Sequence, residues 1–222
     1  MRIFAPARFL DQSTQPHIAT LIALASISAL AMNIFLPSLP SMAAYYNTTP
    51  SIMSLSVAIY LGASALLQLF SGPISDRIGR RPVILISLIL FIIASLATIW
   101  APNAETFLAL RFVQAFAATT MVLSRAVVRD TVGKEAAASK IAYVTMGMAV
   151  APMIGPGIGG YLDKYFGWQA IFVLLAGLGI CIFILTWFDL GETAPKNKTS
   201  FSQQVIEYLS LIHISEPTRP SQ

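Results

Sequence analysis

Charged residues are scarce in this sequence: they make up 11% of its 222 residues, whereas about a quarter is usual in a soluble domain. The few charges stand in short clusters between apolar runs of about twenty residues, the length that crosses the hydrocarbon core of a bilayer. A soluble helical protein with very buried helices would not repeat such charge-free runs. The composition therefore predicts an all-α membrane protein surrounded by a lipid bilayer.

Cysteine and histidine are almost absent, with one and two residues. Cys181 allows no internal disulfide and no cysteine zinc site, and His17 and His213 stand far apart near the two ends. We therefore expect no catalytic residue, no metal site and no enzyme activity. The net charge of +4 does not indicate a nucleic-acid partner, because the basic residues follow the ends of the apolar runs.

Six apolar runs predict six membrane spans, over residues 18–39, 52–70, 83–100, 106–126, 141–162 and 168–188. Basic residues precede the first, third and fifth spans: Arg2 and Arg8; Arg77, Arg80 and Arg81; Arg125, Arg129, Lys134 and Lys140. The other connections carry no basic residue, or Lys164 alone. The positive-inside rule then places the basic connections and both ends of the six-span unit in the cytoplasm, as in a multi-pass protein of the inner membrane.

Proline and glycine interrupt two of the runs. Pro37 and Pro40 stand in the first, and Pro152 and Pro156 stand among glycines in the fifth. A broken helix is tolerated in lipid where neighbouring helices or cavity water satisfy the freed backbone groups. We therefore expect these two spans to be packed or to line a cavity. The third and sixth spans, nearly uniform in Ile, Leu and Phe, are expected to face lipid.

Between the second and third runs lies the charged sequence SGPISDRIGRRPV, residues 71–83. Gly72 and Gly79 permit close approach and unusual backbone angles, and Pro82 can open the next helix. Basic residues alone would set the topology, so Asp76 indicates an ion-pair network that can be made and broken. A solvated loop whose charges only fix the orientation would explain this stretch if it stood alone.

Four motifs in order resemble the major facilitator superfamily. GPISDRIGRR resembles its G-x-x-x-D-R-x-G-R-R/K loop, and NIFLPSLP in the first span resembles the D-x-x-x-P-x-x-P signature of its drug/proton antiporters. LRFVQAFAA resembles the fourth-span R-x-x-Q-G motif, and APMIGPGIGGYL the fifth-span G-P-x-x-G-G motif. LPSLP, SDRIGRRPV and SRAVVRD are most similar to Bcr/CflA-type multidrug exporters. The resemblance, over about residues 15–192, implies the N-terminal six-helix half of a major facilitator fold.

The resemblance assigns a gating role to the charged loop. In the family the loop aspartate, here Asp76, pairs near the cytoplasmic end of the fourth span and helps to lock the outward-facing state. Arg125 and Arg129 are its expected partners. The implied gating residues are Gly72, Asp76, Arg77, Gly79, Arg80, Arg81, Arg125 and Arg129. A latch of this kind is what alternating access requires between two bundles.

Arg111 stands inside the outer part of the fourth span. An arginine in the hydrocarbon costs about 2.5 kcal/mol or more and is by default functional. Gln114 shares its helical face, and Asn33 lies at a similar depth in the first span, so the two spans can meet across a cargo cavity. The alternative for Arg111 is a side chain that extends to the outer interface.

Asn33 departs from the family pattern, which usually has aspartate at this position. Asparagine does not titrate, and no Asp or Glu remains deep in any of the six predicted spans. The carboxylate that couples transport to protons is then expected in the second half of the transporter or near an interface, where Asp189 is the local candidate.

The fifth span carries the motif residues Ala151, Gly155, Pro156, Gly159 and Gly160. The resemblance implies that they seal the contact between the two transporter halves against proton leak. Ordinary close packing of small residues explains the same pattern nearly as well.

The chain divides into four segments. We interpret residues 1–17 as a cytoplasmic N-terminus, 18–190 as the six-helix bundle and 191–208 as the start of a central cytoplasmic loop. Residues 209–222 begin with LSLIHISEPTR, which looks like the translated end of a sequencing-library adapter and is excluded from the fold. Because major facilitators normally have twelve spans, the expected partner is the missing C-terminal six-helix half.

The resemblance implies a multidrug exporter that expels small amphipathic or apolar compounds by alternating access. A proton gradient supplies the energy in place of a cofactor. One alternative is a major facilitator for a specific metabolite. A membrane-embedded enzyme or assembly factor is the other alternative; it would cluster nucleophiles, bases or metal ligands at one membrane depth, and the sequence shows none.

Overall fold

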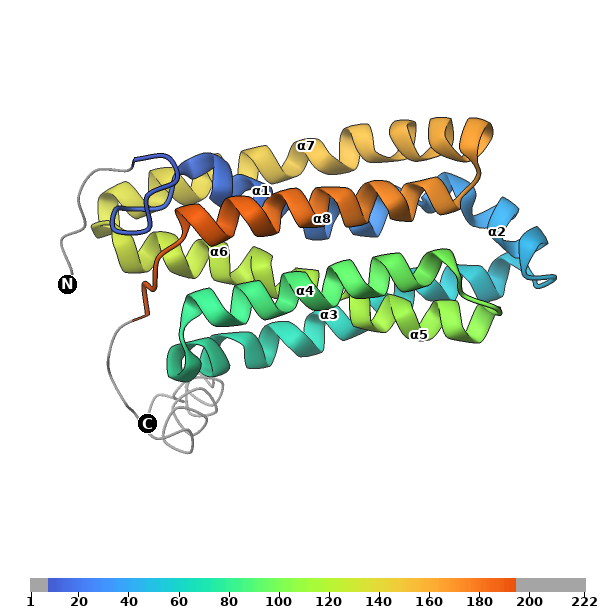
Figure 1. The fold of residues 1–222 in the computed structure, drawn as a ribbon, viewed down its shortest axis with the longest axis horizontal. Helices are drawn as coiled ribbons and strands as arrows, with labels where there is room; N and C mark the ends of the chain where they lie inside the picture. Colours follow the sequence, from blue (N-terminus) through green and yellow to red (C-terminus); the bar gives the residue numbers. More distant parts are fainter. Residues whose placement is uncertain (1–7, 195–222) are drawn as a thin grey trace, which may run out of the picture.

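The structure, a computed structural model, describes residues 8–194, without the side chains of residues 134 and 135. Within this range the chain is helical and has no strand (Figure 1). Its elements are α1 (Ile18–Asn33), η1 (Leu36–Ser38), α2 (Leu39–Tyr45), α3 (Pro50–Ile78), α4 (Arg80–Ile99), α5 (Ala104–Gln114), α6 (Ala117–Thr131), α7 (Lys134–Phe166) and α8 (Gln169–Asp189). The expectations for residues 1–7, including Arg2, and for the segment 195–222 fall outside the described residues.

Six helices of the described chain are long and apolar enough to cross a membrane, which confirms the predicted number. The first span combines α1, η1 and α2, and the fourth combines α5 and α6. The second and fifth are longer than predicted, because α3 and α7 continue into the polar residues that flank their apolar cores.

Two spans contain a break. The first breaks after Asn33, where Pro37 has no amide hydrogen to donate and its ring obstructs the preceding turn. The fourth breaks after Gln114 without a proline. There the amides of Phe116 and Thr119 donate to carbonyls three residues back, at 3.1 and 3.0 Å, which is the tighter 3-10 pattern.

The fifth span is not broken, contrary to the prediction from Pro152 and Pro156. Both prolines lie inside the continuous helix α7, and Pro73 lies in the same way inside α3. A membrane helix tolerates proline where neighbouring groups and local adjustment satisfy the freed carbonyl.

The predicted loop 71–83 is likewise mostly helical, since α3 ends at Ile78 and α4 begins at Arg80. Only Gly79 separates the two helices, and its φ of 115° is a conformation that other residues rarely adopt.

The helices pair in a symmetric pattern. α1 packs along α7 and α6, α3 packs along α5 and α6, and α4 packs along α8 (Figure 1). Exchanging the first three spans with the last three leaves these pairings unchanged. Two equivalent three-helix repeats produce this pattern, with the first and fourth spans at equivalent positions.

The third and sixth spans face outward on one side only. Leu88 and Phe91 of α4 are buried together with Phe172 and Leu175 of α8, whereas Ile93 of α4 is exposed. The two helices therefore pack against each other and present their other faces outward. The prediction that these spans face lipid therefore fits only the exposed face of each helix.

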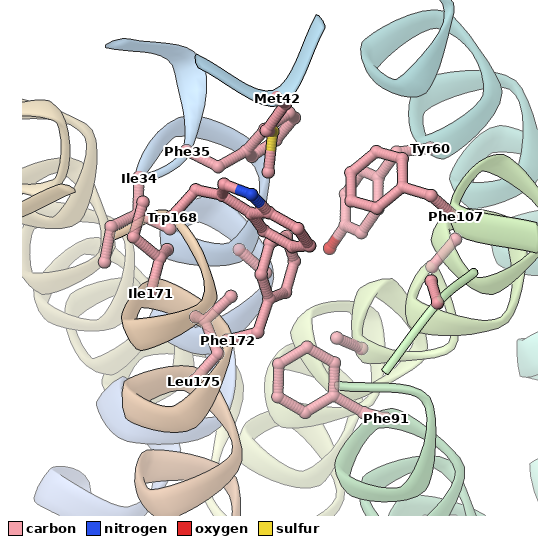
Figure 2. Packing of buried hydrophobic residues seen from close by; sticks show 14 of the residues in the cluster. Ile34, Phe35, Met42, Tyr60, Phe91, Phe107, Trp168, Ile171, Phe172 and Leu175 are labelled. Atoms are coloured by element: carbon pink, nitrogen blue, oxygen red, sulfur yellow. The ribbon is translucent and has the colours of Figure 1, made fainter. Parts of the chain in front are cut away.

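An aromatic cluster closes one end of the bundle. The ring of Phe107 on α5 meets the rings of Trp168 and Phe172 edge to face, with centroids 6.2 and 5.8 Å apart (Figure 2). We call this the aromatic end; the basic end is the opposite one, where α3 meets α4 and both described termini lie. The cluster fixes α5 against α8.

Candidate transport pathway and gate

A cavity of about 430 Å³ opens between α1, α3, α6 and α7. Its lining residues are Ser28, Ala29, Met32, Asn33, Tyr60, Leu61, Ser64, Ala65, Gln68, Met121, Met148 and Pro152. None of these twelve carries a charge at neutral pH. The wall is thus apolar with a few hydroxyl and amide groups, which is the usual composition of a small-molecule site.

Asn33 lines this cavity, as expected, but it does not meet Arg111. Its Nδ2 donates to the backbone oxygen of Ala29 at 2.8 Å, one turn earlier in the same helix. Arg111 and Gln114 are not among the lining residues. The first and fourth spans are therefore joined by other contacts than the predicted pair.

Arg111 is completely buried in the bundle, so its side chain does not extend to the interface. Its Nη1 donates to the backbone oxygen of Ala31 on α1 at 3.2 Å and to Oε1 of Gln114 at 2.7 Å. The guanidinium lies over the rings of Phe35 and Tyr60, 4.1 and 4.6 Å from their centroids. Two aromatic faces thus solvate this cation.

Tyr60 connects this buried arginine with the cavity. Its hydroxyl donates to the backbone oxygen of Ser28 at 3.1 Å and lies 3.2 Å from the Ser28 hydroxyl, while its ring supports Arg111. Both Tyr60 and Ser28 line the cavity. Tyr60 was not among the residues predicted from the sequence, where it stands as a phenol inside an otherwise apolar run.

The gate residue Asp76 pairs with Arg80, one helical turn later, with Nη2 2.5 Å from Oδ1. The same guanidinium holds Asp130 at the end of α6, with Nε 3.0 Å from Oδ2, and contacts the Ser75 hydroxyl. Arg80 therefore bridges the α3–α4 turn to the fourth span.

The expected partners of Asp76 are wrong. No ion pair joins it to Arg125 or Arg129 among the described residues. Arg129 is exposed and Arg125 half-buried. The reason is geometric. Arg80 follows Asp76 by one helical turn, so the two side chains meet, and the same arginine also reaches Asp130 at the end of α6.

The other predicted gating residues surround this bridge. Gly72 lies within α3 and Arg77 is exposed on its last turn. Arg81 donates from Nη2 to the backbone oxygen of Trp187 at 3.0 Å, and its guanidinium lies 5.2 Å from the centroid of that ring. The charged turn is thereby fixed to the end of α8.

Three motif glycines of the fifth span, Gly155, Gly159 and Gly160, face the first span of the same bundle. Gly155 and Gly159 are buried, and a Cβ at Gly159 would collide with the backbone oxygen of Ile34. A Cβ at Gly160 would make ordinary contact with Pro37. Ala151 is buried as well, and Pro156 is half-buried. Close packing of α7 on α1 at the break of the first span accounts for this pattern.

Comparison with known proteins identifies the family. The family model described as Major Facilitator Superfamily matches residues 21–219. The chain belongs to this superfamily.

Its relatives within the superfamily include resistance proteins. It is 33% identical over 187 residues to a bicyclomycin resistance protein homolog of Haemophilus influenzae, covering 84% of this chain and 47% of that protein. It is 39% identical over 158 residues to a chloramphenicol resistance protein of Pseudomonas aeruginosa, covering 69% of this chain and 37% of that protein. These relatives agree with the resemblance to Bcr/CflA-type exporters. The chain spans about half the length of the curated relatives that it matches.

A solved structure shows the same fold. The human organic anion transporter MFSD10 (TETRAN) superposes with a TM-score of 0.66 at 20% sequence identity, over 80% of this chain and 48% of that one. This major facilitator chain thus has the fold that the four motifs implied.

Two carboxylates at the basic end of this major facilitator chain have contacts that the motifs did not indicate. Oε1 of Glu192 accepts the amide hydrogen of Arg80 at 2.8 Å, which caps the first turn of α4. A Cβ at Gly79 would also meet this carboxylate, but the glutamate side chain is flexible and exposed, so the backbone angle is the main reason for glycine there. Glu192 lies in the segment interpreted as the start of the central cytoplasmic loop, and no motif in that segment predicted this contact.

Asp189 is the other carboxylate, and it is completely buried. It accepts the amide hydrogens of Leu10 at 2.9 Å and His17 at 2.8 Å and the hydroxyl of Thr20 at 2.6 Å. These contacts tie the start of the first span to the end of the sixth. Both carboxylate oxygens of Asp189 therefore accept hydrogen bonds, and the residue anchors α1.

Proposed function

We propose that this chain is the N-terminal half of a twelve-span exporter that uses the proton gradient to expel small amphipathic or apolar compounds across the inner membrane. The observation that carries the proposal is the cavity of about 430 Å³ between α1, α3, α6 and α7. In a major facilitator such a cavity would form one wall of the cargo site, and the second half would supply the other wall.

The chemistry of the wall supports amphipathic cargo. Its methionine, leucine and alanine side chains offer apolar contact, while Ser64 and Gln68 offer hydrogen bonds to a few polar atoms. A transporter for a charged metabolite would need a complementary charge at the site. The twelve lining residues contain no such charge, which favours export of uncharged amphiphiles over transport of an ionic metabolite.

The ion-pair bridge at the basic end supports alternating access. Arg80 holds Asp76 and Asp130 through contacts that are partly exposed, since 27% and 18% of the two carboxylate side chains are accessible. Partly exposed ion pairs are individually weak, so a change of conformation can break and remake them. We propose that this bridge is intact when the basic end is closed and opens with it.

Proton coupling and orientation rest on similarity and on the distribution of charge. The relatives with drug-resistance names and the antiporter-like motifs favour a proton-driven exporter. Because Asn33 does not titrate, the proton is expected on a carboxylate of the second half. The arginines at the basic end favour a cytoplasmic N-terminus.

The test uses the full-length gene from which this chain comes, expressed in a drug-sensitive bacterial host beside residues 1–208 and 1–222. The full-length protein should lower the accumulation of a neutral fluorescent amphiphile, and a protonophore should abolish the effect. Both shorter chains should insert without lowering accumulation, because one cavity wall is missing. Protonophore-sensitive efflux by either short chain, or none by the full-length protein, would contradict the proposal.

A further inference from the structure

Among the described residues, no carboxylate pairs with the buried cation of Arg111. The described ion pairs of this chain involve only Arg80, Asp76 and Asp130, all at the basic end. Arg111 is fully buried, and its Nε and Nη2 have no hydrogen-bond acceptor. Its positive charge is met only by two aromatic faces and by the oxygens of Ala31 and Gln114.

This charge lies directly behind the cavity wall. The Arg111 guanidinium is 4.6 Å from the centroid of Tyr60, and Tyr60 is itself a lining residue. The cation therefore contacts the ring of a residue that lines the space that cargo would occupy. Tyr60 cannot move aside freely, because its hydroxyl is held by Ser28.

The ring does not screen the charge from the cavity. A cation on one face of an aromatic ring is attracted by the electrons of that ring, which leaves the ring a poorer partner for a second cation. Two unit charges about 10 Å apart, at an effective dielectric constant of about 20, change a binding constant by roughly tenfold. A cationic cargo would meet this repulsion without any compensating carboxylate on the wall.

From this arrangement we infer that the cavity wall selects cargo by charge: it accepts neutral amphiphiles and disfavours lipophilic cations. The unpaired guanidinium of Arg111 behind Tyr60 is the residue that sets this preference. The inference rests on the proposed function, because it assumes that this cavity is part of the cargo site. It adds the charge class of the cargo, which the names of the two resistance-protein relatives do not specify.

The test compares two dyes of nearly the same shape, a neutral styrylpyridine and its N-methylpyridinium counterpart. Purified full-length transporter in lipid nanodiscs is titrated with each, and dye fluorescence gives the two dissociation constants. The neutral dye should bind about tenfold more tightly than the cation. Equal or tighter binding of the cation would overturn the inference.

Two pairs of variants test the electrostatic origin. Arg111→Gln should remove most of the preference by tightening binding of the cation, whereas Arg111→Lys should keep the preference. Gln68→Glu adds a carboxylate to the wall at nearly constant shape and should favour the cation by a similar factor, whereas the uncharged Gln68→Met should not. If Arg111→Gln binds neither dye, the ratio of the two dissociation constants in Gln68→Glu tests the electrostatic explanation instead. An unchanged dye ratio in Gln68→Glu would overturn the electrostatic explanation.

The outcomes separate this inference from the proposed function. The full-length protein could export both dyes equally well in a protonophore-sensitive way. That result would support the proposed exporter and overturn the charge selection. Absence of binding and export for both dyes would overturn both.

Discussion

The guanidinium of Arg80 lies 3.0 Å from the carboxylate of Asp130, a residue fifty positions later in the chain. This contact joins the turn between the second and third spans to the end of the fourth. Because the same guanidinium also holds Asp76, the two carboxylates share one cation. The proposed gate is thus a three-residue bridge centred on an arginine.

Asp76→Asn in the full-length protein should reduce efflux several-fold and leave membrane insertion unchanged. The substitution removes one of the two negative charges that hold Arg80, and it touches no residue of the cavity wall. Drug resistance at matched expression measures the effect.

Asp11→Asn is the matched control for the gate, because Asp11 is a partly exposed aspartate of the N-terminal segment outside the bridge. Hydrogen bonds from the Ser13 hydroxyl and amide lower the pKa of Asp11, so it is ionised at neutral pH. Removing this charge should leave resistance intact. Wild-type resistance in Asp76→Asn would exclude a gating role for Asp76.

Glu192→Ala should lower the thermal stability of the protein, because it removes the acceptor for the first amide of α4. A side-chain cap contributes about 1 kcal/mol, which corresponds to a fall of about 3 °C in the midpoint of unfolding. Glu192→Gln keeps an oxygen acceptor and should recover most of the loss. Equal midpoints for the alanine variant and the wild type in a thermal-shift assay would show that the cap carries no stability.

Gly159→Ala should destabilise the contact between α1 and α7, since the new Cβ would collide with the backbone oxygen of Ile34. Forcing the two helices apart costs about 1–3 kcal/mol. Gly157→Ala in the same helix is the control, because nothing lies within 4 Å of a Cβ there. It should be neutral or slightly stabilising, in line with the higher helix propensity of alanine. Similar yields and unfolding midpoints for the two variants would contradict the close packing described for α7.

Arg111→Ala should impair export several-fold, because it removes the only side chain that joins the Ala31 carbonyl, Gln114 and two aromatic rings in the core. Arg111→Lys keeps the charge but loses the planar, five-donor group, so it should retain part of the activity. Export rates at equal surface expression distinguish the two. An alanine variant as active as the wild type would reduce Arg111 to a packing residue.

The class of the protein, the number of its spans and the end at which the charges gather could all be predicted from the residues alone. These features depend on local composition: a run of about twenty apolar residues must cross the bilayer as a helix whatever its neighbours are. The four motifs in order likewise predicted the superfamily. The break after Asn33 followed from Pro37, since proline lacks the amide hydrogen that the helix needs.

Only the tertiary structure decided which side chains meet. The partner of Arg80 at Asp130, the cap from Glu192 and the position of Tyr60 between Arg111 and the cavity all join residues far apart in the sequence. The break of the fourth span at Ala115 was not predicted, because no proline stands there. Such contacts depend on how each helix is rotated and how deeply it packs. Rotation and depth are set by the fit between neighbouring helices, which the local composition of one span does not contain.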